Sequence, residues 1–110
     1  MGLCADTCHL FAAGYELDTE PGVRRCFAEL RHARLTRRLG LVHANDSKDA
    51  CGSTRDRHEN LGAGTIGEAA FAELVRHPAV REVPLIVETP SPPDSSGHAA
   101  DVAFLNALPA

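Results

Sequence analysis

The sequence predicts an α/β fold with a parallel sheet, because a short apolar segment, a polar loop and a helical pattern follow one another three times. The three apolar segments are residues 2–6, 39–43 and 83–87. Apolar residues at helical spacing come after each of them. Ionisable residues stand where each apolar segment ends, which is where ligands gather in folds of this class.

The first segment, residues 2–6, is expected to lead into a polar turn at residues 7–9. A helix is predicted from about Thr19 to Arg38, with Thr19 or Pro21 at its start. Its apolar positions recur at helical spacing and are Val23, Phe27, Leu30 and Leu35.

A long polar loop at residues 44–64 separates the second strand from its helix. Loops of this length inside a compact domain usually carry function. Thr65 and Glu68 fit a capping box for the next helix. The third strand, residues 83–87, is the clearest candidate for a buried strand. Apolar residues between positions 102 and 108 predict the last helix.

The chain has 110 residues, enough for one small core but fewer than the roughly 250 residues of a complete eight-fold βα barrel. Its net charge of −4 argues mildly against nucleic-acid binding, although bound divalent cations would reverse that charge locally. Six arginines between positions 24 and 38 could form a nucleic-acid patch. A solvated helix face is the favoured interpretation.

The four cysteines are Cys4, Cys8, Cys26 and Cys51. We interpret them as reduced thiols of a cytoplasmic protein. A disulfide scaffold is disfavoured because no signal peptide precedes them. A four-thiolate zinc site is disfavoured because Cys26 and Cys51 stand apart from any second close pair.

The candidate site consists of ionisable residues at the strand ends and in the long loop: Asp6, His9, His43, Asp56, His58 and Glu88. Asp56 and His58 are two residues apart, so in an extended segment both point the same way. A buried carboxylate such as Glu88 needs a partner. Each pair by itself also fits a turn with a surface histidine, but residues of this kind at all three strand ends favour a site.

Three carboxylates and three imidazoles suit zinc, with manganese or iron as alternatives, and exceed what one tetrahedral zinc can use. Clustered metals are a common device for phosphodiester cleavage. Arg57, between two predicted ligands, is a candidate phosphate contact. Asn45 and its neighbours could orient the ligands or only make turns. The remaining histidines are expected to face solvent and are His32, His77 and His98.

Several segments resemble signatures of the endonuclease IV-type apurinic/apyrimidinic (AP) endonucleases. They are residues 2–9 (GLCADTCH), 42–48 (VHANDSK) with 52–53 and 56–58, 61–64 and 87–89. The second of these is long, has several fixed spacings and is highly specific. The resemblance extends from Gly2 to about Leu105.

The resemblance implies that residues 1–110 are the C-terminal part of a (βα)8 TIM barrel, about the last three βα units. It implies a DNA-repair enzyme of the deoxyribonuclease IV type, which hydrolyses the phosphodiester 5′ to abasic sites in double-stranded DNA with up to three zinc ions. Carried over by motif, Asp6, His43 and Glu88 resemble ligands of one zinc. His9, Asp56 and His58 resemble the complete protein ligand set of another, and Arg57 resembles a DNA contact.

The sequence departs from the family pattern at Ala5 and Ala44, where larger aliphatic residues are usual. The family's remaining ligands, two histidines and a bridging glutamate, come from earlier strands, so the chain is expected to begin at about the sixth strand. One complete and one partial zinc site, and little or no activity alone, are therefore expected. Two alternatives stay open: a sugar isomerase-like metal-dependent TIM barrel, and a non-catalytic metal-binding fragment that needs the missing N-terminal part of the barrel.

Overall fold

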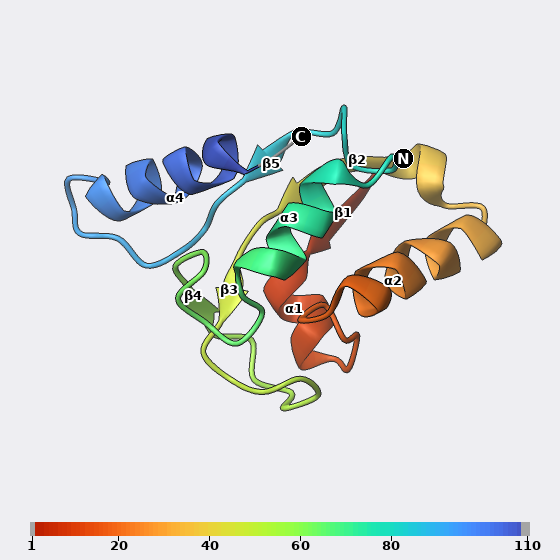
Figure 1. Cartoon of the computed structure of the whole chain (residues 1–110), viewed down its shortest axis with the longest axis horizontal. Coiled ribbons are helices and arrows are strands. Elements are labelled where there is room, and N and C mark those ends of the chain that lie inside the picture. The colour runs from red at the N-terminus through yellow and green to blue at the C-terminus, as the bar shows by residue number, and fades with distance from the viewer. Residues whose placement is uncertain (1, 109–110) are drawn as a thin grey trace.

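A three-stranded parallel sheet forms the centre of the structure, a computed structural model that describes residues 2–108 (Figure 1). Its strands are β1 (Leu3–Asp6), β2 (Leu39–His43) and β5 (Leu85–Ile86), in the order β1-β2-β5. The pairing of β1 with β2 brings Asp6 opposite His43, and His43 in turn lies opposite Ile86. The predicted α/β class with a parallel sheet is confirmed.

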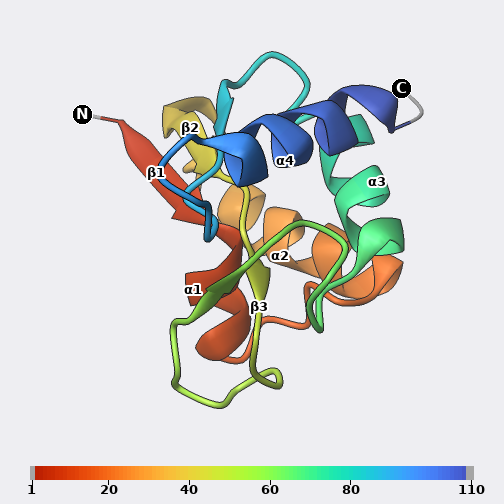
Figure 2. The same ribbon diagram turned by 90° about the vertical axis from the view of Figure 1, so that its left-hand side faces the viewer.

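Helices and a small second sheet surround these strands. The helices are α1 (Thr7–Ala12), α2 (Glu20–His32), α3 (Glu68–Arg76) and α4 (Ser96–Ala107), with a 3₁₀ turn at Thr36–Arg38. Two short antiparallel strands, β3 (Asp46–Ser47) and β4 (His58–Glu59), lie beyond the carboxyl end of β2 (Figure 2). None of the helices between residues 2 and 108 is long and apolar enough to cross a membrane.

The hydrophobic core lies where α1, α2 and α3 meet the sheet. Phe11, Val42 and Phe71 are almost completely buried there, and α2 contacts α3. Burying each such side chain stabilises the fold by about 1.5–3 kcal/mol. The core therefore fixes the sheet, and with it the positions of the strand ends.

Residues 7–9 form the start of α1 and not the polar turn that the sequence predicted. Thr7, Cys8, Phe11 and Ala12 are buried on one side of this short helix. The carboxylate of Asp6 caps it by accepting a hydrogen bond from the backbone N–H of His9 at 3.1 Å. The strand thus passes directly into a helix, which fixes the position of Asp6 at the junction.

The helix predicted from Thr19 to Arg38 is shorter than expected. Its start is confirmed, since the Thr19 hydroxyl accepts a hydrogen bond from the backbone N–H of Gly22 at 3.0 Å. The helix ends at His32, because Arg34 adopts the left-handed conformation (φ 59°) and the N–H of Leu35 turns back to the carbonyl of Leu30. Left-handed residues commonly end helices in this way.

The capping box predicted for Thr65 and Glu68 is wrong. Helix α3 begins after Gly67, whose φ of 87° favours glycine, and has no side-chain cap. The Thr65 hydroxyl instead donates to the backbone carbonyl of Asp49 at 2.5 Å, and the Thr65 backbone N–H donates to the carbonyl of Ser47 at 2.9 Å. Thr65 is therefore bonded to the chain that follows β2, and its side chain does not cap α3.

The third strand is shorter and more exposed than the predicted buried strand at residues 83–87. Only Leu85 and Ile86 form β5, and Ile86 is 46% exposed. Within the described part of the chain β5 pairs with β2 alone, so it is an edge of the sheet. An edge strand keeps a solvated side, which explains the exposure.

The carboxylate of Asp46 holds the second half of the long loop in place. It is fully buried and accepts hydrogen bonds from five backbone N–H groups, those of Ser47, Gly62, Gly64, Ile66 and Gly67, at 2.8–3.2 Å. A Cβ atom at Gly64 would collide with Asp46 itself, so only glycine allows this approach. The loop from β4 to α3 is therefore folded around one buried negative charge.

We predict that Asp46→Asn lowers the free energy of unfolding by about 2–4 kcal/mol, because an amide cannot accept from all five donors and is uncharged. Urea denaturation followed by circular dichroism measures the change. The matched control is Asp18→Asn at an exposed position, which should change stability by less than about 0.5 kcal/mol. Equal effects of the two substitutions would contradict a special role for Asp46.

Candidate functional site

Three predicted site residues meet beyond the carboxyl ends of the parallel strands. Asp6 ends β1, His43 ends β2, and Glu88 follows β5 by two residues. His43 Nδ1 lies 2.5 Å from Glu88 Oε1 and 3.8 Å from Asp6 Oδ2. One ligand atom from each residue lies within 4.8 Å of the other two, close enough to share a metal ion. We call these residues the strand-end group.

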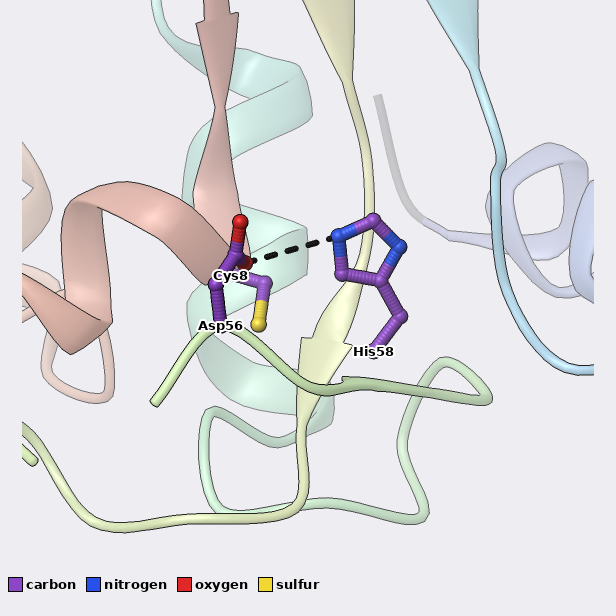
Figure 3. Close-up of side chains that lie close together, drawn as sticks. All are labelled: Cys8, Asp56 and His58. Atoms are coloured by element: carbon purple, nitrogen blue, oxygen red, sulfur yellow. Dashed lines mark ion pairs between the residues drawn. The ribbon is translucent and has the colours of Figure 1, made fainter. Parts of the chain in front are cut away.

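A second group forms around Asp56 and His58 from the long loop (Figure 3). Asp56 Oδ1 lies 3.5 Å from His58 Nε2, and Asp56 Oδ2 lies 3.3 Å from His9 Nδ1. His9 comes from α1, so its exposed imidazole reaches Asp56 across 47 positions of the chain. These three residues, which we call the loop group, are joined through the Asp56 carboxylate.

The two groups are parts of one site because His58 contacts both. Its Nε2 lies 3.5 Å from Asp6 Oδ2, and its Nδ1 lies 2.9 Å from the backbone carbonyl of Glu88. A carbonyl oxygen accepts only, so Nδ1 donates to it, and Nε2 is the ring nitrogen that faces the carboxylates of Asp6 and Asp56. The imidazole is thereby prepared to bind a cation through Nε2.

Cys8 is a member of this neighbourhood that the sequence did not identify as a site residue. Its sulfur lies within 4.8 Å of ligand atoms of Asp56 and His58, and its thiol donates to the backbone carbonyl of Arg57 at 3.3 Å. Burial, followed by the hydrogen bond with Asp56, raises the pKa of the Cys8 thiol to about 12. The thiol is therefore neutral near pH 7 and acts as a donor that holds the loop.

Asn45 is completely buried and forms hydrogen bonds with the last residue of β1 and with the segment after β5. Its side-chain oxygen accepts from the backbone N–H of Glu88 at 2.8 Å, and its side-chain amide donates to Asp6 Oδ2 at 3.4 Å. Its backbone N–H also donates to the Thr7 hydroxyl at 2.9 Å. Of the two interpretations left open for Asn45, orientation of neighbouring site residues is the one that these contacts favour.

The side chain of Arg57 binds Asp49, which does not belong to either group of site residues. Its Nε and Nη2 donate to the two carboxylate oxygens of Asp49 at 2.8 and 2.6 Å. This bidentate bond lowers the pKa of Asp49 and raises that of Arg57. The backbone carbonyl of Arg57 also accepts from the N–H of Lys48 at 3.1 Å, so Arg57 fastens the loop group to the chain that follows β3.

Helix α4 is attached next to Glu88. The buried carboxylate of Asp101 accepts hydrogen bonds from the backbone N–H of Leu61 at 3.0 Å and from the hydroxyl of Thr89. His98 Nε2 lies 2.7 Å from the Thr89 carbonyl. These contacts connect α4 to the long loop and to the residue after Glu88.

Two of the three histidines predicted to face solvent do not. His98 is half-buried against Thr89, and His77 stacks on the ring of Phe27 with centroids 4.5 Å apart. Burial lowers the pKa of His77. Phe27, the partner of His77, is distant in sequence, and Thr89, the partner of His98, lies before α4. Helical periodicity contains neither contact and therefore predicts that both histidines face solvent. His32 is exposed, as expected.

The site has the ligand atoms and the spacing to hold cations. Three carboxylates and three imidazoles converge from β1, α1, β2, the long loop and the segment after β5. Four of the five carboxylate–imidazole distances are 3.3–3.8 Å, near the roughly 3.4 Å expected for two ligands bound tetrahedrally to one zinc. His43 and Glu88, at 2.5 Å, would have to separate by about an ångström to share an ion.

Comparisons with known proteins agree with one another. The model of the family described as "Xylose isomerase-like TIM barrel" matches residues 1–108. The chain is 51% identical over 108 residues to "Probable endonuclease 4" of Streptomyces coelicolor, covering 98% of this chain and 36% of that relative. It is 53% identical over 90 residues to "Probable endonuclease 4" of Methanoculleus marisnigri, covering 82% and 32%.

The structure is also similar to the crystal structure of endonuclease IV from Thermus thermophilus. The TM-score is 0.84 at 32% identity, and the match covers 98% of this chain and 38% of that one. The chain thus spans about a third of the length of the relatives that it matches. Its fold is part of a TIM barrel.

We predict that Asn45→Ala weakens binding of a divalent cation by about 10–100-fold, because Asp6 and the backbone of Glu88 lose the side chain that sets their spacing. Competition with a chromophoric chelator measures the affinity. Asn106→Ala, at an exposed position on α4, serves as the control and should leave affinity unchanged. An Asn45→Ala protein that is folded and binds the cation as tightly as the unmodified chain would contradict the positioning role.

Proposed function

This chain belongs to the xylose isomerase-like TIM barrel family, and we propose that it is the metal-binding part of a DNA-repair endonuclease that hydrolyses the phosphodiester 5′ to abasic sites. The observation that supports this most is the convergence of Asp6, His43 and Glu88 with the loop group at the ends of parallel strands. The names of the two relatives, both "Probable endonuclease 4", agree with it.

We propose zinc as the metal, with manganese as the alternative. The mixture of imidazole and carboxylate ligands suits zinc, and each imidazole of the loop group lies 3.3–3.5 Å from an oxygen of Asp56. In this proposal His9, Asp56 and His58 hold one ion, while Asp6, His43 and Glu88 hold part of the ligand set of another. A ligand set with three members leaves a position open for water or substrate.

Clustered zinc ions, when bound, polarise a phosphoryl oxygen, supply hydroxide near neutral pH and stabilise the leaving oxygen. The chain's own residues prepare the place for this chemistry. Asn45 sets the distance between Asp6 and the Glu88 segment, and the bond from His58 Nδ1 to the Glu88 carbonyl turns Nε2 toward the carboxylates. Both contacts are made before any ligand arrives, which reduces reorganisation on binding.

Arg57 is the proposed contact to a DNA phosphate. Asp49 engages its Nε and Nη2, while Nη1 offers two further N–H donors. The side chain is 57% exposed, so a phosphate can approach this free edge. Asp49 fixes the guanidinium and also competes for it, so the contact is expected to orient DNA more than to add affinity.

A second candidate is a metal-binding barrel fragment that acts only with a partner chain. Strand β1 pairs with β2 alone in the described residues, and an apolar hollow of about 340 Å³ lies beside it, lined by Leu3, Leu10 and Leu30 among others. An unpaired parallel edge next to apolar side chains suits the docking of another strand and helix. The remaining strands and helices of a TIM barrel fit this description. A sugar isomerase-like activity is the other alternative, because that name describes the family model.

We predict that the purified chain binds zinc and that Asp56→Asn/His58→Ala removes at least one ion per chain. Both side chains belong to the loop group, so their loss leaves His9 without partners for the metal. Metal analysis after dialysis measures the content. His32→Ala, an exposed histidine outside the site, is the control and should keep the full complement.

We predict that a chimera cuts DNA where this chain alone does not. In the chimera, the matched 108 residues of the Streptomyces coelicolor relative are replaced by those of this chain. It should incise an abasic duplex on the 5′ side, lose that activity with a chelator, and regain it with zinc. Asp56→Asn in the chimera should lower incision by at least about a hundredfold.

Two results would contradict the nuclease proposal. One is a folded, zinc-loaded chimera that leaves abasic duplex intact, and the other is sugar isomerisation by it. Restoration of incision when this chain is mixed with the remainder of the relative, made as a separate chain, would support the partner-dependent version.

A further inference from the structure

A basic segment lies at the opposite end of β2 from the metal site. Residues 31–38 contain four arginines, Arg31, Arg34, Arg37 and Arg38, and no aspartate or glutamate, although the chain has a net charge of −4. Four of the six arginines elsewhere are paired: Arg24 and Arg76 contact Glu73, Arg25 contacts Glu16, and Arg57 contacts Asp49. Between residues 2 and 108, no carboxylate lies within ion-pair distance of the four arginines of this segment.

Three of these arginines surround one hollow. Arg31, Arg34 and Arg37 line it together with Thr36, and its volume is about 370 Å³. All three arginines are exposed. Like charges gathered around one concavity repel each other, and an anion placed among them converts that repulsion into attraction. We call this concavity the arginine hollow.

Arg34 has a strained left-handed backbone conformation, and ending the helix does not require an arginine at this position. Arg34 has φ 59°, and glycine or asparagine is the usual residue at a left-handed position after a helix. The attraction of the helix dipole explains Arg31, which lies in the last turn of α2, but Arg34 and Arg37 lie beyond the helix. The chain therefore keeps an arginine where glycine would fold more easily.

A polar atom without a partner stands beside these guanidinium groups. Thr36 Oγ1 is shielded from solvent and, in the described part of the chain, makes no hydrogen bond. Buried hydroxyl groups almost always have a partner, which is sometimes a ligand or an ordered water. Thr36 also lines the arginine hollow, so a bound oxyanion could provide that partner after a small movement.

We propose that the arginine hollow is a phosphate-binding site, separate from the metal site. Guanidinium groups bind phosphate oxygens in bidentate fashion, and three of them suit a group with two negative charges. The hollow includes residues of the 3₁₀ turn before β2, and that end of β2 is about 13 Å along the strand from His43. The phosphate belongs either to a nucleic-acid backbone or to a small free phosphate ester. This inference does not depend on the proposed nuclease activity.

The test compares two triple variants that lose the same charge. Arg31→Gln/Arg34→Gln/Arg37→Gln removes the hollow, and Arg24→Gln/Arg25→Gln/Arg76→Gln removes three arginines that are paired elsewhere. Binding is measured in chelator, without metal, by fluorescence anisotropy with a lesion-free duplex and by calorimetry with pyrophosphate. The first variant should bind at least one probe about tenfold more weakly or worse, and the second within about twofold of the unmodified chain.

The two probes identify the source of the phosphate. A loss with the duplex, together with a salt-dependence slope reduced by about 2–3, assigns the site to a nucleic-acid backbone. A loss with pyrophosphate alone assigns it to a small phosphate ester. Equal losses in the two variants, or no measurable binding of either probe by the unmodified chain, would overturn the proposal.

A single substitution separates binding from folding. Arg34→Gly relieves the left-handed strain, so its melting temperature should stay the same or rise, while its affinity for the probe that binds should fall about threefold or more. Circular dichroism confirms that each variant is folded. A glycine variant that is more stable and binds unchanged would show that Arg34 does not contribute to a phosphate site.

Discussion

The buried carboxylate of Asp46 is the contact on which the shape of the functional end depends. Five backbone N–H groups surround it, and four of them come from the chain between β4 and α3. A buried charge without donors would be very costly, so this loop has few alternatives to closing around the carboxylate. The closed loop places β4 against β3, and β4 begins with His58. Asp46, which is not one of the proposed metal ligands, thus determines where His58 lies.

The site extends this arrangement across the sheet. Asn45, next to Asp46, joins Asp6 to the backbone of Glu88, while the Cys8 thiol and the N–H of Lys48 both donate to the carbonyl of Arg57. Buried residues thus position the site side chains, which are themselves exposed or half-exposed. The electrostatic cost of gathering three carboxylates is limited by the imidazole rings, which lie between the carboxylates and keep them apart. Bound cations would reduce it further.

Much of this arrangement could be predicted from the sequence, because apolar segments show where strands end and parallel strands end at one edge. That reasoning located Asp6, His43 and Glu88 and selected the loop residues Asp56 and His58. It could not find the pairing of β3 with β4, since strands of two residues have no periodicity. The roles of Thr65, Asn45 and Cys8 depend on partners 16 to 49 positions away, which no local pattern contains. The left-handed Arg34 was missed because helical spacing continues through Leu35, although the helix does not.

His58 has a consequence for how the protein tolerates change. Its ring touches the backbone after β5 through one nitrogen and the carboxylate at the end of β1 through the other. An imidazole is planar and cannot stretch, so it works as a spacer of constant width between β1 and β5, which do not pair with each other in residues 2–108. Neither a longer nor a shorter side chain preserves that width. A substitution in β1 therefore affects the segment after β5 through His58, which belongs to neither. Substitutions in the two segments have to be compatible with each other.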